Sequence, residues 1–140
     1  MQVLVPWLHM MSFSVWLGVN VLFLGILLPA SRSLPAAERA RTLRRAGRAL
    51  NAVVAVAAPV TVVSGIGGVW LTGYAAPTSG AFLAFATKTL LTAVMIVNHG
   101  LQAFRYRPPA EGPLDGRDPW TRLLVANVVL GVLVLLLSLL

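Results

Sequence analysis

The sequence predicts an all-α integral membrane protein, folded as one domain of four transmembrane helices. Of its 140 residues, 58% are hydrophobic, which is more than a soluble domain usually carries. Four apolar runs are long enough to cross a bilayer, at 3–29, 49–74, 81–104 and 120–140. The alternating pattern of β-barrel strands is absent. The spans are therefore predicted to be helices, which satisfy their own backbone hydrogen bonds in lipid.

The positions of the charges predict the orientation of the bundle. The net charge of +7 would also suit a nucleic-acid-binding protein, but the basic residues are divided unevenly among the connections. Six lie in the first connection (Arg32, Arg39, Arg41, Arg44, Arg45, Arg48) and four in or beside the third (Arg105, Arg107, Arg117, Arg122). The second connection, 75–80, has none. By the positive-inside rule, connections one and three are cytoplasmic and both termini lie outside, with membrane lipid rather than nucleic acid as the partner.

The first span has one polar stripe and a proline at its end. Residues at helical spacing on this stripe are predicted to face the interior of the bundle, namely His9, Phe13, Trp16 and Asn20. Pro29 is expected to end the helix. The arginine-rich connection that follows is expected to be partly helical and to lie along the inner head groups.

The second span is rich in small residues. Pro59 is expected to kink it. Four small residues allow a neighbouring backbone or a flat ligand to approach closely, namely Ser64, Gly65, Gly67 and Gly68. The short turn after this span predicts that the second and third spans are antiparallel neighbours.

The third span carries the only lysine of the chain and one of its two histidines. Lys88, Thr92, Met95 and His99 share one helical face. A charge within hydrocarbon is costly, so this face is expected to point into the bundle.

The fourth span is expected to begin at Asp118, Pro119 and Trp120, which provide a cap, a first-turn proline and an interfacial tryptophan. Asn127 and Gly131 are its interior features.

Few groups in the spans can carry chemistry. The chain has no cysteine, which excludes disulfides, iron–sulfur clusters and thiolate metal sites. All four acidic residues fall in or at the edge of the cytoplasmic connections, which excludes paired-carboxylate catalysis in the bundle. His9, Lys88 and His99 remain. His9 and Lys88 are predicted to lie at one level in the outer leaflet, whereas His99 lies about 16 Å deeper.

Haem is the cofactor that best fits this set, because a neutral imidazole is a strong axial ligand. His9 and His99 lie too far apart along the bundle to bind one iron together. Lys88 would pair with a haem propionate. Copper is the alternative, since His9, Met10 and Met11 offer soft ligands, but consecutive helical residues point about 100° apart.

The same residues can also be interpreted as purely structural. His99 would bond another helix, Lys88 would reach the outer interface, and the methionines would pack. Asn20 and Asn127 would bond between helices.

Several of these residues also occur in a known pattern. Trp7, His9, Trp16 and Gly18 resemble the first helix of the HemJ-type protoporphyrinogen oxidases and of the CopD copper-resistance family. The third span, with a lysine at its start and a histidine eleven residues later, is similar to the HemJ pattern. The HemJ pattern also has a Leu-Pro-Arg segment and a tyrosine–histidine pair, neither of which follows Gly18 here.

The HemJ resemblance implies a haem-b protein that oxidises protoporphyrinogen IX, in a bacterial inner membrane. It implies His9 as the axial ligand and Lys88 as necessary for the cofactor or for activity. The candidate site predicted from the whole sequence has Lys88 as the catalytic residue and His9 and His99 as candidate metal ligands. Trp16 and Asn20 are predicted to make further contacts with the cofactor. The CopD resemblance implies copper transport or delivery. A third class is an accessory structural subunit of a larger membrane complex (respiratory or photosynthetic), and a homo-oligomer is a further form of assembly.

Overall fold

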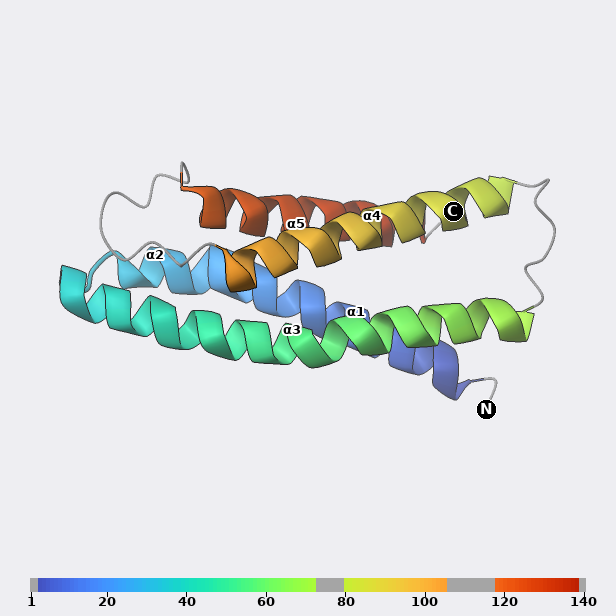
Figure 1. Cartoon of the computed structure of the whole chain (residues 1–140), viewed down its shortest axis with the longest axis horizontal. Coiled ribbons are helices and arrows are strands. Elements are labelled where there is room, and N and C mark those ends of the chain that lie inside the picture. The colour runs from blue at the N-terminus through green and yellow to red at the C-terminus, as the bar shows by residue number, and fades with distance from the viewer. Residues whose placement is uncertain (1–2, 73–79, 106–117, 139–140) are drawn as a thin grey trace.

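The computed structural model describes residues 3–72, 80–105 and 118–138. Within them the chain is helical, in the order α1 (Leu4–Leu22), η1 (Phe23–Leu27), α2 (Leu28–Ser31), α3 (Ala36–Thr72), α4 (Gly80–Phe104) and α5 (Pro119–Leu137). The first three elements form one continuous rod (Figure 1). Four helices in these ranges are long and apolar enough to cross a membrane. The prediction of four apolar helices in an all-α fold is confirmed.

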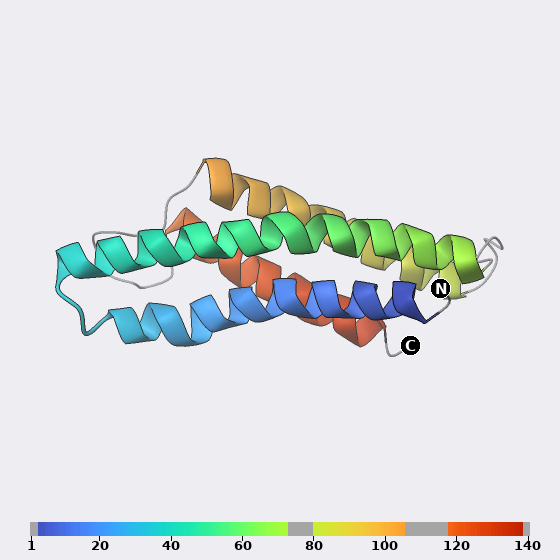
Figure 2. The ribbon, with the colours of Figure 1, turned by 90° about the horizontal axis from the view of Figure 1, so that it is seen from below.

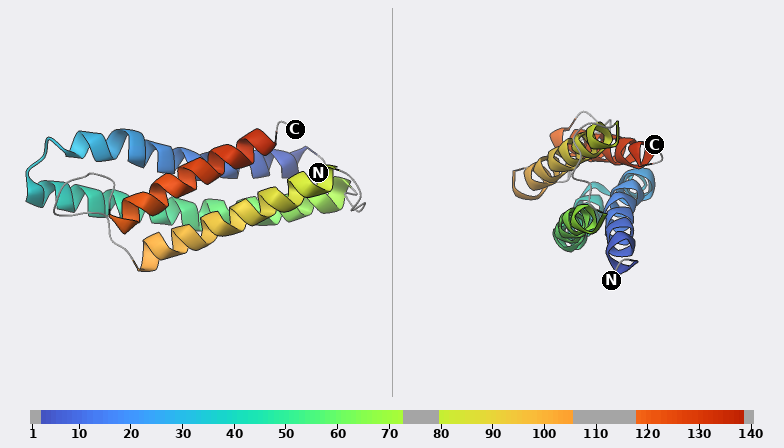
Figure 3. Two further views of the ribbon diagram at one scale, coloured as in Figure 1. Left: turned by 90° about the horizontal axis from the view of Figure 1, so that it is seen from above. Right: turned by 90° about the vertical axis from the view of Figure 1, so that its right-hand side faces the viewer.

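The helices pack as two antiparallel pairs. α1 packs along α3, α4 packs along α5, and contact between α1 and α5 joins the pairs. A view down the long axis shows the two pairs side by side (Figure 3, right). The start of α1 and the end of α5 lie at one end of the bundle, here called the terminal end, and the arginine-rich start of α3 lies at the other, the arginine end (Figure 2).

The second and third spans, α3 and α4, pack against each other less closely than the sequence predicts. α4 contacts α3 only slightly and packs mainly on α5. Its buried side carries Met95 and Gln102, which are fully covered, and the rest of the helix surface is largely exposed. The turn 73–79 that motivated the prediction lies outside the described residues.

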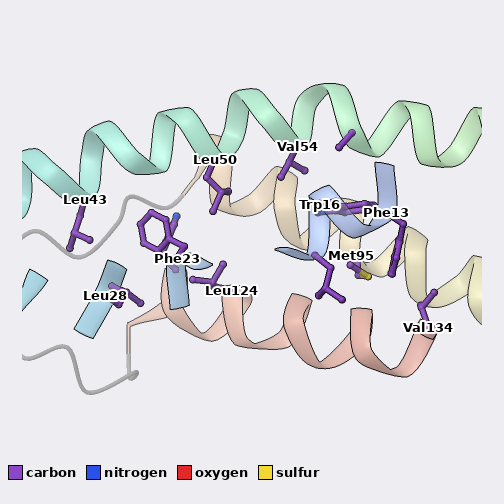
Figure 4. Close-up of a cluster of buried hydrophobic side chains, with 13 residues drawn as sticks. Phe13, Trp16, Phe23, Leu28, Leu43, Leu50, Val54, Met95, Leu124 and Val134 are labelled. Atoms are coloured by element: carbon purple, nitrogen blue, oxygen red, sulfur yellow. The ribbon is translucent and has the colours of Figure 1, made fainter. Parts of the chain in front are cut away.

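The basic connection is also different from the prediction, because α3 begins at Ala36 rather than near residue 49. An apolar stripe on this extension is buried, with Ala40, Leu43 and Leu50 as its members. This stripe packs the extension against the end of the first rod, as Figure 4 shows for Leu43 and Leu28. The arginine segment is therefore a straight continuation of the second span and does not form a separate helix along the head groups.

Pro29 does not end the first helix, which continues to Ser31. The helix widens just before the proline, where η1 is a π-helical segment and the Leu28 amide donates to the Phe23 carbonyl. A proline has no N–H and its ring crowds the preceding turn. The π-helical segment relieves this crowding, so the helix passes the proline.

The start of α5 confirms one prediction and corrects another. The Asp118 carboxylate accepts from the Thr121 amide at 2.8 Å, as expected of a cap, and Pro119 is in the first turn. Trp120, however, does not face the interface. It is 2% exposed and its ring lies 4.8 Å from that of Phe23, so it joins α5 to the first rod.

An apolar cluster runs along the space between the helices (Figure 4). Phe13 and Trp16 make an edge contact near the terminal end, with ring centroids 6.4 Å apart. Each buried aromatic or branched side chain in such a cluster contributes roughly 1.5–3 kcal/mol in water, less where lipid is the alternative. Close packing therefore matters more than burial in the part of the bundle that lipid surrounds.

Candidate functional site

His9 lies at the seam between α1 and α3, where its ring is held by the backbone of α3. Its Nδ1 lies 2.8 Å from the Thr61 carbonyl oxygen. A carbonyl only accepts, so Nδ1 carries the proton and donates it. Nε2 then holds the lone pair of the neutral imidazole. A hydrogen bond of this kind fixes the tautomer and ring orientation of histidines that bind metals.

Hydroxyl groups surround this contact. Thr61 donates to the Ser12 hydroxyl at 2.9 Å, and Ser12 donates to the Leu8 carbonyl at 2.7 Å. The Ser64 hydroxyl lies 3.4 Å from His9 Nδ1 and donates to a carbonyl of its own helix. Each hydroxyl around His9 Nδ1 thus has a hydrogen-bond partner, which holds the imidazole in a defined place.

Gly65 makes room for the ring. A Cβ at this position would lie 3.0 Å from His9 Cε1 and 3.3 Å from Nδ1. Gly67, one half-turn on, faces Val5 at 3.5 Å. The small residues of α3 therefore admit α1 and its histidine. They do not form an open slot for a flat macrocycle on this face of α3.

His9 and Lys88 occupy the same level of the bundle, on different helix pairs. A Cβ on Gly131 of α5 would lie 2.6 Å from Leu17 on α1 and 3.4 Å from Met95 on α4, so these three residues lie at one level of the bundle. His9 is eight residues from Leu17 and Lys88 is seven from Met95, about 12 and 10 Å toward the terminal end. α1 nevertheless packs on α3 and α5 rather than on α4. Lys88 is half-buried, and its carbonyl accepts from Thr92.

His99 lies away from His9. It is four residues beyond Met95, so it is about 18 Å from His9 along the bundle axis, counting both offsets. Its Nδ1 is buried without a hydrogen-bond partner in the described parts of the chain. The two histidines therefore do not form one bis-histidine site.

Trp16 and Asn20 are both fully buried, as the stripe on the first span predicts. Asn20 donates to the Trp16 carbonyl at 2.7 Å. They lie seven and eleven residues beyond His9, about 10 and 16 Å deeper. They belong to the packed interior rather than to the immediate surroundings of the His9 ring.

The methionines next to His9 do not form a cluster with it. Met10 and Met11 are exposed on the outer surface of α1, whereas Met95 is fully buried. Among the described residues there is no group of three or more histidine, aspartate or glutamate side chains that could hold a metal ion. A metal site made by these residues alone is therefore not formed around His9.

The close approach predicted at Ser64 and Gly65 is present, but the sequence did not identify His9 as the residue that lies there. Ser12 lies one turn after His9, and Thr61, Ser64 and Gly65 lie one turn apart on the second span. This spacing marks a common face on each helix. The missing information was the register of the two helices, which a single sequence does not state.

Comparison with known proteins adds no relative. No family model matches the sequence, and no curated protein or solved structure matches the chain.

Proposed function

We propose that the chain is a multi-pass protein of the bacterial inner membrane that binds haem b, with His9 Nε2 as the axial ligand. The observation that supports it is the bond from His9 Nδ1 to the Thr61 carbonyl, 2.8 Å long. That bond uses the one nitrogen that an axial ligand does not need. No described group of the chain forms a hydrogen bond with Nε2.

The orientation in this proposal places the arginine end in the cytoplasm. Arg41, Arg44, Arg45 and Arg48 are exposed on α3 at this end. Arginines beside a span are retained on the cytoplasmic side and contact anionic head groups. His9 and Lys88 then lie in the outer half of the membrane, with both chain ends outside.

Lys88 is the residue that pairs with the carboxylates of the porphyrin in this proposal. It shares the level of His9, and its long side chain is only half-buried. An ammonium beside a propionate in low dielectric offsets part of the desolvation of both charges. A bound haem would supply one-electron redox chemistry, and Lys88 would orient either the haem or a porphyrin substrate. In the enzyme form of the proposal, the chain is an oxidoreductase acting on protoporphyrinogen IX.

An accessory role in a larger complex is the second candidate. In the most apolar 18-residue window of α4, 6% of the window is buried inside the bundle. The corresponding share is 33% for the first rod and 33% for α5. Most of α4 is thus available to lipid, to a second copy of the chain, or to another membrane protein. Copper binding is less well supported, because Met10 and Met11 point away from the seam that holds His9.

Absorption spectra of the detergent-purified protein test these alternatives. We expect a Soret band in the wild type and in His99→Ala, and its loss in His9→Ala. His99→Ala is the matched control, because it removes an imidazole about 18 Å away along the bundle. A band that survives in His9→Ala contradicts the axial assignment. A featureless spectrum with stoichiometric copper, lost in Met10→Leu and Met11→Leu, supports copper. A featureless spectrum with a co-purifying membrane subunit supports the accessory role.

A further inference from the structure

Polar atoms without partners lie in the middle of the bundle, among the side chains of the apolar cluster. Three carboxamide oxygens and one imidazole nitrogen are buried there with no hydrogen-bond partner among the described residues. They belong to Asn20, Asn51, His99 and Asn127, one residue from each of α1, α3, α4 and α5. These four residues, together with Gln102, are called the polar layer below.

The contact at Gly131 relates three of these helices. A Cβ on Gly131 would lie 2.6 Å from Leu17 Cδ1 and 3.4 Å from Met95 Cε. α1, α4 and α5 therefore meet at one level.

From that level, Asn20, His99 and Asn127 are each three or four residues nearer to the arginine end. The direction is the same on all three helices, because α5 runs opposite to α1 and α4 (Figure 3). The offset is about 5–6 Å on each helix at the standard rise. The three side chains therefore share one level.

Asn51 reaches the same level from α3. The hydrogen bond between Thr61 and Ser12 fixes the register of α3 on α1. Asn20 is eight residues beyond Ser12, and Asn51 is ten residues before Thr61. The two asparagines thus lie within about 3 Å of each other along the axis.

Among the described residues, both ends of the Gln102 carboxamide and the amide groups of Asn20 and Asn127 have partners. Asn127 Nδ2 donates to Gln102 Oε1 at 3.4 Å, and Gln102 Nε2 donates to the Trp120 carbonyl at 3.2 Å. Asn20 Nδ2 donates to the Trp16 carbonyl. Asn20 and Asn127 are 0% exposed, so neither lipid nor bulk solvent reaches their oxygens. A carboxamide oxygen left this way is an acceptor in need of a donor.

A buried donor lies one turn from Asn20. The indole Nε1 of Trp16 is covered by protein and has no partner in the described chain. The region therefore offers both acceptors and a donor that the residues in 3–72, 80–105 and 118–138 do not pair.

We propose that the polar layer binds water inside the bundle. Water donates to carboxamide oxygens and accepts from an indole N–H, and a buried water typically has about two to four such partners. A metal cation suits the layer poorly, because none of its five side chains is a carboxylate and the chain carries a net charge of +7. Bound water would also give the His99 imidazole a partner with which to exchange a proton. The proposal does not depend on haem binding.

Hydroxyl-radical footprinting with X-rays tests this proposal on the full chain in lipid nanodiscs. Radicals form from bound water and oxidise side chains beside it, and mass spectrometry reads the oxidation. We expect Trp16, although 0% exposed, to be oxidised at no less than about one tenth of the rate of Trp70, which is 84% exposed. A rate below that limit contradicts the presence of water in the layer.

A variant identifies which residues hold the water. Asn20→Leu combined with Asn127→Leu removes two of the unpaired acceptors, and we expect Trp16 oxidation to fall about tenfold. Asn98→Leu is the matched control, because Asn98 adjoins His99 but is outside the layer. Unchanged oxidation in the folded double variant contradicts the assignment. If the double variant does not fold, the wild-type measurement still decides whether water is present.

Discussion

The two helix pairs place polar side chains at their seams with different chemistry. Near the terminal end, the groups between α1 and α3 are hydroxyls and one imidazole, and they bond one another, as Thr61 does with Ser12 and His9. Between α4 and α5 they are carboxamides, and Asn127 keeps an unpaired oxygen although its amide is bonded to Gln102. Near the terminal end the α1–α3 seam is closed by its own residues, whereas Asn127 on the α4–α5 seam, like Asn20 and Asn51 deeper in the bundle, keeps an unpaired oxygen.

The difference follows from how many bonds each group requires. A serine or threonine hydroxyl can donate to a carbonyl of its own helix, as Ser12 does to Leu8, and still accept from a neighbouring helix. A carboxamide has two donors and an oxygen, so a dry seam rarely satisfies all of it. We infer that the α1–α3 seam near His9 is suited to holding one side chain rigidly, and the level of Asn127, which also carries Asn20 and Asn51, to binding a small polar guest.

The joint between the two pairs is apolar, and its loss would have the largest effect. Trp120→Ala removes a ring that is 2% exposed and contacts Phe23. We expect it to lower the free energy of unfolding in detergent by about 3–5 kcal/mol, as for other buried tryptophans. Trp70→Ala, at an 84% exposed position, is the control and should change it by less than about 0.5 kcal/mol. Equal losses in the two variants would show that the pairs do not meet through Trp120.

The fit of His9 against α3 gives the next largest effect. In Gly65→Ala, the new Cβ would lie 3.0 Å from His9 Cε1 and displace the ring from the Thr61 carbonyl. Under the proposed function, we expect haem affinity to fall about 10–100-fold, the usual effect of disturbing a residue that orients a metal ligand. Haem titration followed at the Soret band measures it. Gly67→Ala, whose Cβ would make an ordinary 3.5 Å contact with Val5, should leave the affinity unchanged.

The sequence was sufficient for the spans but not for how they pair. Apolar length alone marks the four helices, and helical spacing correctly places Trp16 and Asn20 in the interior. The start of α3 was not predicted, because the many arginines made the segment resemble a surface connection although it has a buried apolar stripe that includes Leu43. Trp120 was assigned to the interface because a tryptophan at a span end usually lies there. Only the partner helix shows that its ring packs against Phe23.

The candidate site around His9 could likewise be predicted only in part. Counting residues gives the common level of His9 and Lys88, since the helical rise is fixed. It does not give the neighbour of His9, which is Thr61 on α3, because that depends on the register between two helices. The unpaired oxygens of Asn20 and Asn127 likewise appear only once burial is known.

The smallest expected effect is the energy of the hydrogen bond between the Ser12 and Thr61 hydroxyls. This energy also tests directly how the α1–α3 seam near His9 is held together. Ser12→Ala and Thr61→Val each remove one end of the 2.9 Å bond, and the double variant closes a thermodynamic cycle. We expect a coupling energy of about 0.6 kcal/mol, because hydrogen bonds between membrane helices are weak on average. Unfolding in mixed micelles measures it, and Ser14→Ala, at an exposed position on α1, is the control for Ser12→Ala. A coupling energy of zero would mean that the two hydroxyls bond only their own helices, at Leu8 and Ala57. The α1–α3 seam would then owe its closeness to Gly65 and the His9 ring, and the contrast with the α4–α5 seam would be one of packing instead of hydrogen bonding.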